Sequence, residues 1–313
     1  MTTATRRTDS HDDALVPAFT LKPIERKAEV NAPPTVQAPN FINDIAAGKV
    51  ELPTIPAVVQ RLIVALRDPD VDTRKIGEAL SKDPVLSAKV LRLANSAFFG
   101  GQRSMSSIDA AVALIGIQAL NRLIVACGVA SSFKEIPGID LKVFWRDALV
   151  AATAAHKLAQ RLQAESEEAY TCGLLHGTGH LILCQTYPDI ANAMFTGFAT
   201  VRGAELAGIE QGAFGIDHPA VGALWVETLG FPQPVADTIR KSAEAPTDKD
   251  SSLDLALRSA VALAASVAQN DAAEAAFAAL PPNMKSRFSA ADGSPDAAFV
   301  KLYETLQETE PAL

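Results

Sequence analysis

Aromatic residues and cysteines are scarce in this sequence. Phe, Trp and Tyr make up 6% of the 313 residues, and three cysteines occur, at Cys127, Cys172 and Cys184. Their spacing fits neither a zinc knuckle nor a Cys-x-x-Cys pair, the patterns that indicate a structural metal or a redox site. We therefore expect three buried, reduced thiols in a cytoplasmic protein, because an unpaired cysteine behaves as a small hydrophobic residue.

An excess of positive charge is also missing. The 28 Lys and Arg residues face 36 Asp and Glu residues, which gives a formal net charge of −8. Such a chain lacks the electrostatic footprint of a protein that binds nucleic acid or an anionic membrane. No uninterrupted run of 18 apolar residues occurs, which predicts no membrane span. The first residues, MTTATRRTDSHDD, lack the apolar segment of a secretory signal.

Strand patterns are rare, and helical patterns take their place. The chain is rich in alanine and leucine, which favour helix, and poor in runs that alternate β-branched and polar residues. Hydrophobic residues make up 48% of the sequence, enough to bury a core in one large or two smaller domains. With no internal repeat and no βαβ pattern, the sequence predicts an all-α fold.

Residues 1–40 differ in composition from the rest of the chain. Five prolines interrupt this segment, its charges are mixed, and no apolar period continues beyond a few residues. Such a segment cannot bury enough apolar surface to order itself, so we expect a disordered N-terminal arm.

Several helix boundaries are visible after residue 40. Asp83-Pro84 is a cap followed by proline at the first helical position, a strong helix start. The helix that begins at Ile108 should end near Gly116, and a second helix should follow it. Further helices are expected over residues 142–163, 188–199, 219–229, 234–241 and 255–269, with a final amphipathic helix through Phe299 and Leu306.

Several segments together resemble one bacterial signalling family, the HDOD or HD-related output domain. Its N-terminal half is similar to LPTIPAVVQRLIVALRDPDVD, SKDPVLSAKVLRLANSAFFG and MSSIDAAVALIGIQALNRL, and its second half to FWRDALVAATAAHKLAQRL, AYTCGLLHGTGHLIL and FGIDHPAVGALWVETLGFPQPVADTIR. The resemblance implies an HDOD domain over residues 41–245. It would divide into an N-terminal helical lobe, 41–138, and a C-terminal HD-like lobe, 139–245, with a helical extension at 246–313.

The resemblance also indicates where a metal site would lie. The related HD phosphohydrolases gather histidines and aspartates around one or two metal ions. Asp147 stands where those enzymes have a histidine, and His176-Gly177 stands where they have a His-Asp pair. His180 replaces a common Lys or Arg, and Lys241-Ser242 replaces a common His-His pair. Asp217-His218 fits the family pattern as it stands.

The missing carboxylate at Gly177 should matter most. A carboxylate beside the histidine supplies negative charge to the metal and can bridge two ions, and glycine supplies neither. Losing only an outer partner of a ligand costs about 10–100-fold in affinity or activity, and a lost ligand should cost more. Because hydrolysis depends on the metal's charge, we expect no bound metal, no catalytic residue and no cofactor. The vestigial candidates are Asp147, His176, His180, Asp217 and His218.

A different metal site remains an alternative at the same place. His176 and His180 are four residues apart, which would put both imidazoles on one helix face, as in HExxH proteases. Asp217, His218 or Asp147 could add a third ligand. Against it, the residues between are Gly177, Thr178 and Gly179, with no general-base glutamate, and each glycine costs a helix about 1 kcal/mol. The plainer interpretation is two core imidazoles with protein partners, and glycines that let helices approach closely.

Three functions are compatible with these observations. The first is a non-catalytic signalling module that acts by binding another protein. The second is a residual metal-dependent phosphohydrolase acting on a nucleotide or cyclic dinucleotide. The third is binding of a nucleotide messenger without turnover, for which the sequence offers no arginine-rich motif. We expect the first, with a signalling protein as partner and no nucleic acid or membrane contact. The sequence does not identify that partner or the oligomeric state.

Overall fold

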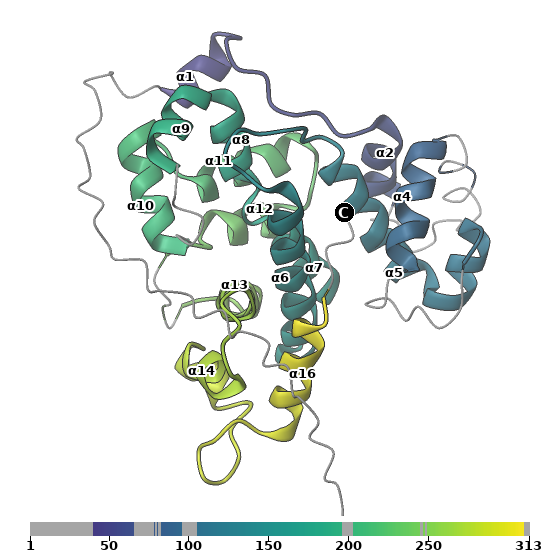
Figure 1. Cartoon of the computed structure of the whole chain (residues 1–313), viewed down its shortest axis with the longest axis vertical. Coiled ribbons are helices and arrows are strands. Elements are labelled where there is room, and N and C mark those ends of the chain that lie inside the picture. Colours follow the sequence, from purple (N-terminus) through teal and green to yellow (C-terminus); the bar gives the residue numbers. More distant parts are fainter. Residues whose placement is uncertain are drawn as a thin grey trace, which may run out of the picture. The chain divides into compact units, whose positions relative to one another are not determined.

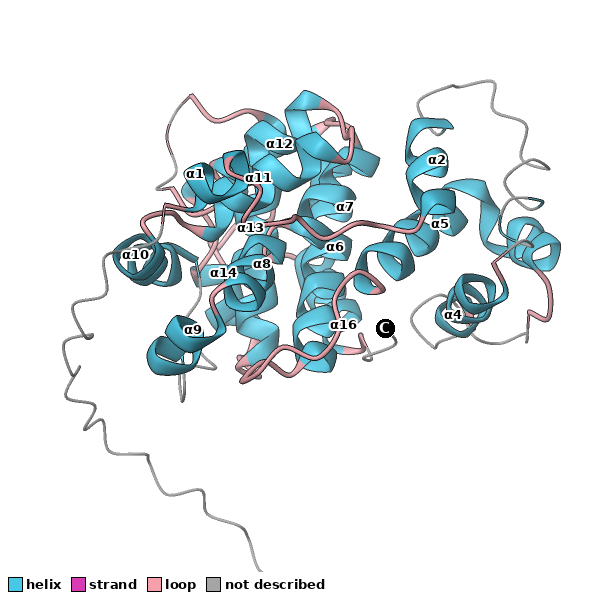
Figure 2. Cartoon of the chain, turned by 90° about the horizontal axis from the view of Figure 1, so that it is seen from above, coloured by secondary structure: helices cyan, strands magenta, loops and turns pink. Residues whose placement is uncertain are grey.

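The computed structural model describes residues 40–65, 78, 80, 83–95, 105–195, 203–244, 247 and 249–309. The expected N-terminal arm therefore lies outside the described residues, apart from Asn40. Helices and loops account for the whole described chain, and its only extended pairings are two isolated bridges, Ile136 with Ile139 and Ser289 with Pro295 (Figures 1 and 2). The predicted all-α class is confirmed.

The first group of helices follows the expected capping residues. It contains α1 (Phe41–Ala46), α2 (Ala57–Ala65), α4 (Pro84–Ala94) and α5 (Ile108–Ala130). Asp83 caps α4 by accepting a hydrogen bond from the Leu86 amide at 2.9 Å. Within α5, Gly116 has φ 81° and ψ 163°, so the helix breaks there as predicted. Asn95 holds the end of α4 by bonding both backbone groups of Met105.

One of these helices has the length and composition of a membrane span. α5 is apolar over enough residues to cross a bilayer, yet 56% of its most apolar window is buried in the protein. The break at Gly116 also divides it into two pieces. Both features are those of a core helix of the first group.

The second group contains α6 to α12 and is built on a close pair of helices. Its members are α6 (Leu141–Leu162), α7 (Ser166–Leu175), α8 (Thr178–Thr186), α9 (Pro188–Phe195), α10 (Gly203–Phe214), α11 (His218–Thr228) and α12 (Gln233–Arg240). α6 and α7 lie side by side (Figure 1). A Cβ at Gly173 would meet the Ala151 carbonyl oxygen at 2.6 Å, so only glycine permits this approach. The long predicted helix at 142–163 is confirmed as α6.

The C-terminal helices complete this second group. They are α13 (Ser252–Ala268), α14 (Ala273–Ala278), α15 (Pro282–Lys285) and α16 (Ala297–Gln307). α13 packs along α6 and α7, and α16 contacts both α6 and α13. Phe299, Tyr303 and Leu306 of α16 are buried, as its amphipathic pattern predicts.

Specific contacts join the two groups. The indole Nε1 of Trp225 in α11 donates to the Pro53 carbonyl oxygen at 2.7 Å. The Phe133 ring lies between two tryptophans, 6.0 Å from Trp145 and 5.4 Å from Trp225 by ring centroids. Tyr187 donates to the Asp44 carboxylate at 3.0 Å. These contacts connect residues before and after the expected lobe boundary at 138–139.

Candidate functional site

The chain bends within the segment LLHGTGHLIL, which contains the candidate metal ligands His176 and His180. α7 ends at Leu175, His176 is its C-cap, and Gly177 is the N-cap of α8. His176 and His180 therefore belong to different helices, and the expectation that both imidazoles share one helix face is wrong. Gly177 lies against the Phe144 ring, since an added Cβ would come within 3.2 Å of it. The Thr178 hydroxyl supports the bend by donating to the Leu175 carbonyl at 2.7 Å.

His176 stays close to its own helix. Its Nδ1 lies 2.7 Å from the Gly173 carbonyl oxygen. Because a carbonyl only accepts, this nitrogen carries the hydrogen of that bond. The ring is thus oriented by α7, one turn back along the chain.

His180 is brought to His218 by the packing of α8 on α11. A Cβ at Gly179 would overlap the His218 carbonyl oxygen and come within 2.7 Å of the Gly222 amide nitrogen. Gly222 in turn lies against α8, since its own Cβ would meet the Gly179 nitrogen at 3.5 Å. The expectation that these glycines permit a close helix approach is confirmed for Gly173 and Gly179. The close approach at Gly179 places the start of α8 against the start of α11.

A buried glutamate joins these two histidines. Glu210 of α10 has no exposed surface. Its Oε1 lies 2.7 Å from His180 Nδ1, and its Oε2 lies 2.5 Å from His218 Nδ1. The same Oε2 accepts the His218 backbone N–H at 2.7 Å. Both oxygens of one carboxylate are therefore engaged by α8 and α11.

These bonds determine the protonation of the cluster. An ionised carboxylate only accepts hydrogen bonds, so each Nδ1 that faces Glu210 carries a hydrogen. Burial by itself raises the pKa of Glu210, but the hydrogen bonds and charges of His180 and His218 outweigh it and leave the pKa below its usual value. The cluster thus holds a buried carboxylate in its charged form, which an unpaired buried carboxyl would not keep.

The remaining candidates make structural contacts. Asp217 is the N-cap of α11 and accepts from the Ala220 amide at 3.0 Å, with proline in the first turn as predicted. Asp147 of α6 is 6% exposed and pairs with the neighbouring Arg146, whose Nη2 lies 2.9 Å from it. A carboxylate paired with an arginine has part of its negative charge already neutralised.

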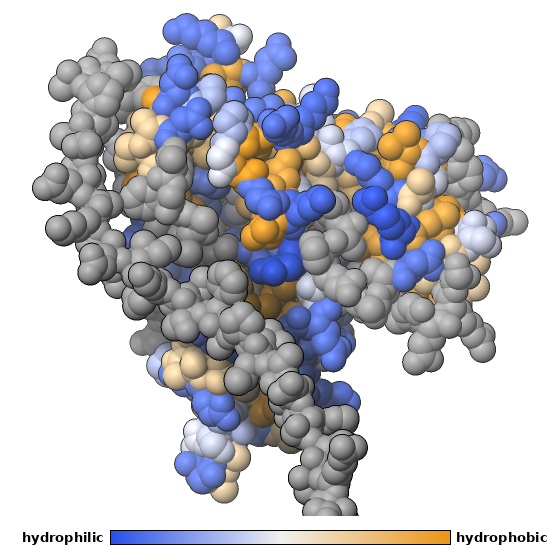
Figure 3. Space-filling view, viewed as in Figure 1, coloured by the Kyte–Doolittle hydropathy of each residue, from blue (hydrophilic) through white to orange (hydrophobic). Residues whose placement is uncertain are grey.

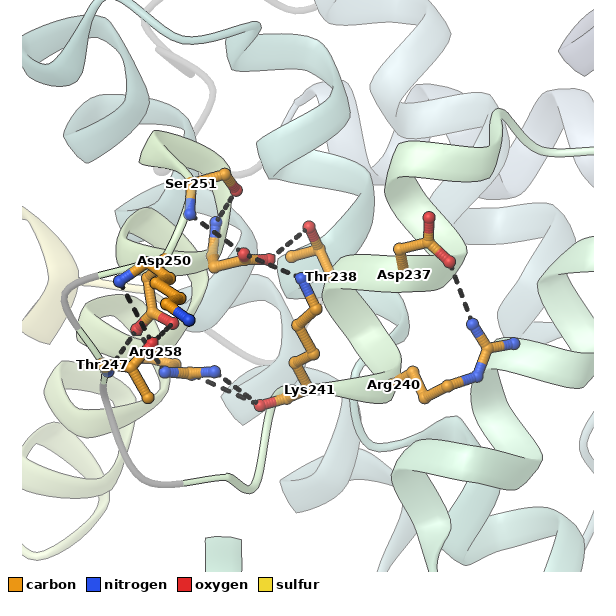
Figure 4. Close-up of polar contacts among 10 residues, drawn as sticks. Asp237, Thr238, Arg240, Lys241, Thr247, Asp250, Ser251 and Arg258 are labelled. Atoms are coloured by element: carbon orange, nitrogen blue, oxygen red, sulfur yellow. Dashed lines mark hydrogen bonds and ion pairs between the residues drawn. The ribbon is translucent and has the colours of Figure 1, made fainter.

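The position of the family's His-His pair is taken by an ionic network between α12 and α13 (Figure 4). Lys241 Nζ lies 3.4 Å from Asp254 Oδ2, and Thr238 donates to Asp254 Oδ1 at 2.8 Å. Burial opposes ionisation of Asp254, but the hydrogen bonds of Thr238 and Ser251 and the charge of Lys241 together lower its pKa. Arg258 donates to the Lys241 carbonyl oxygen and pairs with Asp250. These groups stabilise the helix junction.

His156 belongs to a separate contact between α5, α6 and α7. Arg122 Nη1 lies 3.0 Å from the His156 ring and 3.1 Å from Glu167 Oε1. Burial, and then the charge of Arg122, lowers the pKa of His156. The His156 side chain is 12% exposed, as expected of a packed histidine.

The cysteines are buried, although Cys184 Sγ lies 3.6 Å from His180 Nε2. All three are free and buried. Burial raises the pKa of Cys127 and of Cys184 to about 12, and raises that of Cys172 as well. A thiol with so high a pKa is not a nucleophile at neutral pH. The predicted burial of the three thiols is confirmed.

The donor set does not fit the metal centre of an HD enzyme. Among the described residues, no three His, Cys, Asp or Glu side chains are placed to hold one ion together. The carboxylate beside His176 is replaced by glycine, Asp147 pairs with Arg146, and both Glu210 oxygens bind imidazoles. A cation coordinated by the carboxylate of Asp147 or Glu210 would compete with these contacts.

Glu210 was not predicted from the sequence. It lies on α10, a helix whose segment contains Gly203, Gly208 and Gly212, and glycine weakens a helical pattern. One signal was available: Glu210 is the lone acidic residue in the run LAGIEQGAFG, eight residues before His218. An isolated acid in an apolar run, close to a histidine of the motif, suggests a buried partner.

The comparison with protein families is decisive for the fold and its family. The family model of the HDOD domain matches residues 52–245. This chain belongs to the HDOD family. The match lies within the segment 41–245 that the sequence resemblance indicated, and the HDOD domain therefore contains α8, α10 and α11, which form the His180–Glu210–His218 cluster.

Solved structures similar to this HDOD protein include two whose sequences are more than 25% identical to it. A candidate phosphohydrolase from Shewanella amazonensis SB2B is 28% identical, with a TM-score of 0.69, over 88% of this chain and 98% of that one. An HDOD domain protein of unknown function from Geobacter sulfurreducens is 26% identical, with a TM-score of 0.56, over 73% and 75%. A candidate signal transduction protein from Marinobacter aquaeolei VT8 shares the fold, with a TM-score of 0.60 at 22% identity, over 83% and 59%.

A curated relative is longer than this chain. An uncharacterized protein from Treponema pallidum (strain Nichols) is 27% identical over 192 residues, which is 61% of this chain and 37% of that protein. The matched part of this HDOD chain thus spans little more than a third of the relative's length.

Proposed function

We propose that this HDOD protein is a non-catalytic signalling module that acts by binding another protein. The observation that carries the proposal is the bonding of both carboxylate oxygens of Glu210. Its two oxygens hold His180 at 2.7 Å and His218 at 2.5 Å, so the imidazoles and the carboxylate of the HD-like region stabilise the junction of α8, α10 and α11. In an HD phosphohydrolase such groups would hold a metal ion and activate water.

Two further features support this proposal. Gly177 supplies no ligand at the position of the paired aspartate, and Lys241 brings a positive charge to the position of the His-His pair. Membership of a family of output domains favours regulation through a partner. In addition, no group of three His, Cys, Asp or Glu side chains among the described residues is placed to hold one metal ion.

A hydrolysis assay tests the non-catalytic half of the proposal. The full chain is incubated with bis-p-nitrophenyl phosphate and with linear and cyclic dinucleotides, in the presence of Mn²⁺, Mg²⁺, Fe²⁺ or Zn²⁺ added singly. We expect no turnover above that of the His176→Ala variant under any condition. Metal-dependent turnover by the unaltered chain that His176→Ala abolishes, with the fold intact by circular dichroism, would contradict the proposal.

The proposed binding of another protein needs a separate test. Cross-linking in the source cells followed by reconstitution of the captured complex from purified components should give a defined stoichiometry. A chain that elutes alone with every reconstituted candidate would count against protein binding.

A residual phosphohydrolase is the second candidate function. It is favoured by the likeness to the candidate phosphohydrolase from Shewanella amazonensis SB2B, 98% of which is covered. The same hydrolysis assay distinguishes the two functions.

A further inference from the structure

A cavity of about 160 Å³ lies where α4, α5 and α6 meet. None of the residues of the His180–Glu210–His218 cluster lines it. Its walls combine apolar side chains, two of them aromatic, with three cationic side chains.

One part of the cavity wall is apolar and buried. Phe133 and Trp145 line it, are 5% and 3% exposed, and lie 6.0 Å apart by ring centroids. Cys127 lies beside them as an uncharged thiol. A cavity of about 150 Å³ is large enough for benzene, so this one has room for a body the size of one ring.

The outer wall carries only positive charge. Lys89, Arg92 and Lys142 line the cavity, and none of the described residues that line it is acidic, in a chain whose net charge is −8. Lys89 and Arg92 lie three residues apart on α4, so they share one helix face. Figure 3 shows hydrophobic and strongly hydrophilic side chains beside one another over the part of the molecule that contains α4 and α5.

The charges of two of these residues reach into the cavity. Burial raises the pKa of Cys127 to about 12, and the charges of Lys89 and Arg92 oppose this rise. Lys89 also has a structural role: it donates to Ser131 at 2.9 Å, and Ser131 caps the end of α5 by donating to the Cys127 carbonyl. Lys89 therefore also contributes to the stability of that helix end.

We propose that this cavity binds a small organic anion, with a ring-sized apolar body against Phe133 and Trp145 and a phosphate or carboxylate group among Lys89, Arg92 and Lys142. An apolar pocket with a few convergent polar groups is the usual form of a small-molecule site. Pockets for drug-sized ligands measure about 300–1,000 Å³, so a whole dinucleotide is too large to enter.

Binding here would have a consequence for signalling. α4 and α5 belong to the first group of helices, and α6 is the central helix of the second, so one ligand would contact both groups. A ligand that binds one arrangement of two groups better than another shifts the population toward it. The HDOD protein would then sense a metabolite, whichever partner it binds, and this inference does not rest on the proposed protein binding.

Calorimetry with defined probes tests the site. Phenyl phosphate combines the ring and the anion, inorganic phosphate lacks the ring, and benzyl alcohol lacks the charge. We expect phenyl phosphate to bind at least about 10-fold more tightly than either, the factor that 1.4 kcal/mol provides. Arg92→Gln and Lys142→Gln should each weaken phenyl phosphate several-fold. The control Lys301→Gln removes an equally exposed charge on α16, far along the chain from the cavity residues, and should change nothing.

Tryptophan fluorescence gives a second readout, because Trp145 lines the cavity and Trp225 does not. Its intensity should change with phenyl phosphate and saturate at the calorimetric concentration. Heat and fluorescence that stay flat to millimolar phenyl phosphate would overturn the proposal. So would binding that Arg92→Gln and Lys142→Gln leave unchanged, or that Lys301→Gln weakens equally.

Discussion

The contact between α8 and α11 allows a sharp test with two glycine-to-alanine substitutions. Gly179 faces the backbone of α11, where a Cβ would overlap the His218 carbonyl oxygen and come within 2.7 Å of the Gly222 nitrogen. Gly208 lies on α10 with no heavy atom within 4 Å of its would-be Cβ. The two substitutions add the same methyl group, and only the first has no room for it.

The expected effects have opposite signs. Contacts of a real Cβ below 3.0 Å essentially never occur, so Gly179→Ala must move α8 away from α11. Forcing an extra carbon into a packed site costs about 1–3 kcal/mol. The higher helix propensity of alanine offsets only part of this free-energy cost, because Gly179 lies in the first turn of α8. Gly208→Ala should instead stabilise the protein by about 0.5–1 kcal/mol, since alanine restricts the unfolded chain and suits the helix.

Thermal unfolding followed by circular dichroism measures both changes. For domains of 150–250 residues, 1 kcal/mol corresponds to about 2–4 °C in Tm. Gly179→Ala should therefore lower the Tm by several degrees, and Gly208→Ala should raise it by about 1–4 °C. A Gly179→Ala protein as stable as the unaltered chain would refute the packing that joins His180 to His218.

Three other outcomes follow from buried groups and caps. Glu210→Gln should lower the free energy of unfolding by about 1.5–3 kcal/mol at neutral pH, since it weakens charge-assisted hydrogen bonds; urea titration measures this. Because the folded-state pKa of Glu210 is lowered, that difference should shrink as pH falls from about 4.3, the unfolded value, through the folded value; a difference constant with pH would contradict it. Asp83→Ala removes the α4 cap and should cost about 1 kcal/mol in the same titration. The native cysteines should not react with a thiol reagent at pH 8 until the chain is unfolded, and rapid native labelling would show that they are accessible.

Local signals in the sequence predicted much of the helical framework. Asp83 and Asp217 cap the helices that they were expected to begin, and Gly116 breaks α5 where a stop was expected. A cap or a break depends on a few neighbouring residues, so it can be read from a short stretch of sequence.

The cluster of His180, Glu210 and His218 could not be predicted from short stretches of the sequence. Glu210 and His180 are 30 residues apart, and no spacing rule connects them. The helix that carries Glu210 was missed because its three glycines weaken the pattern. The single helix expected through His176 and His180 was wrong because α7 ends at Leu175 and α8 begins at Thr178, a bend that the four-residue spacing could not reveal.

Metal analysis of the full chain, purified without chelator and without an affinity metal, tests the central claim most directly. If Glu210 holds His180 and His218 for structural purposes, the protein should contain far less than one Mn, Fe, Zn or Mg ion per chain and should stay folded. One or two tightly held ions per chain, lost on His180→Gln or His218→Gln, would contradict it.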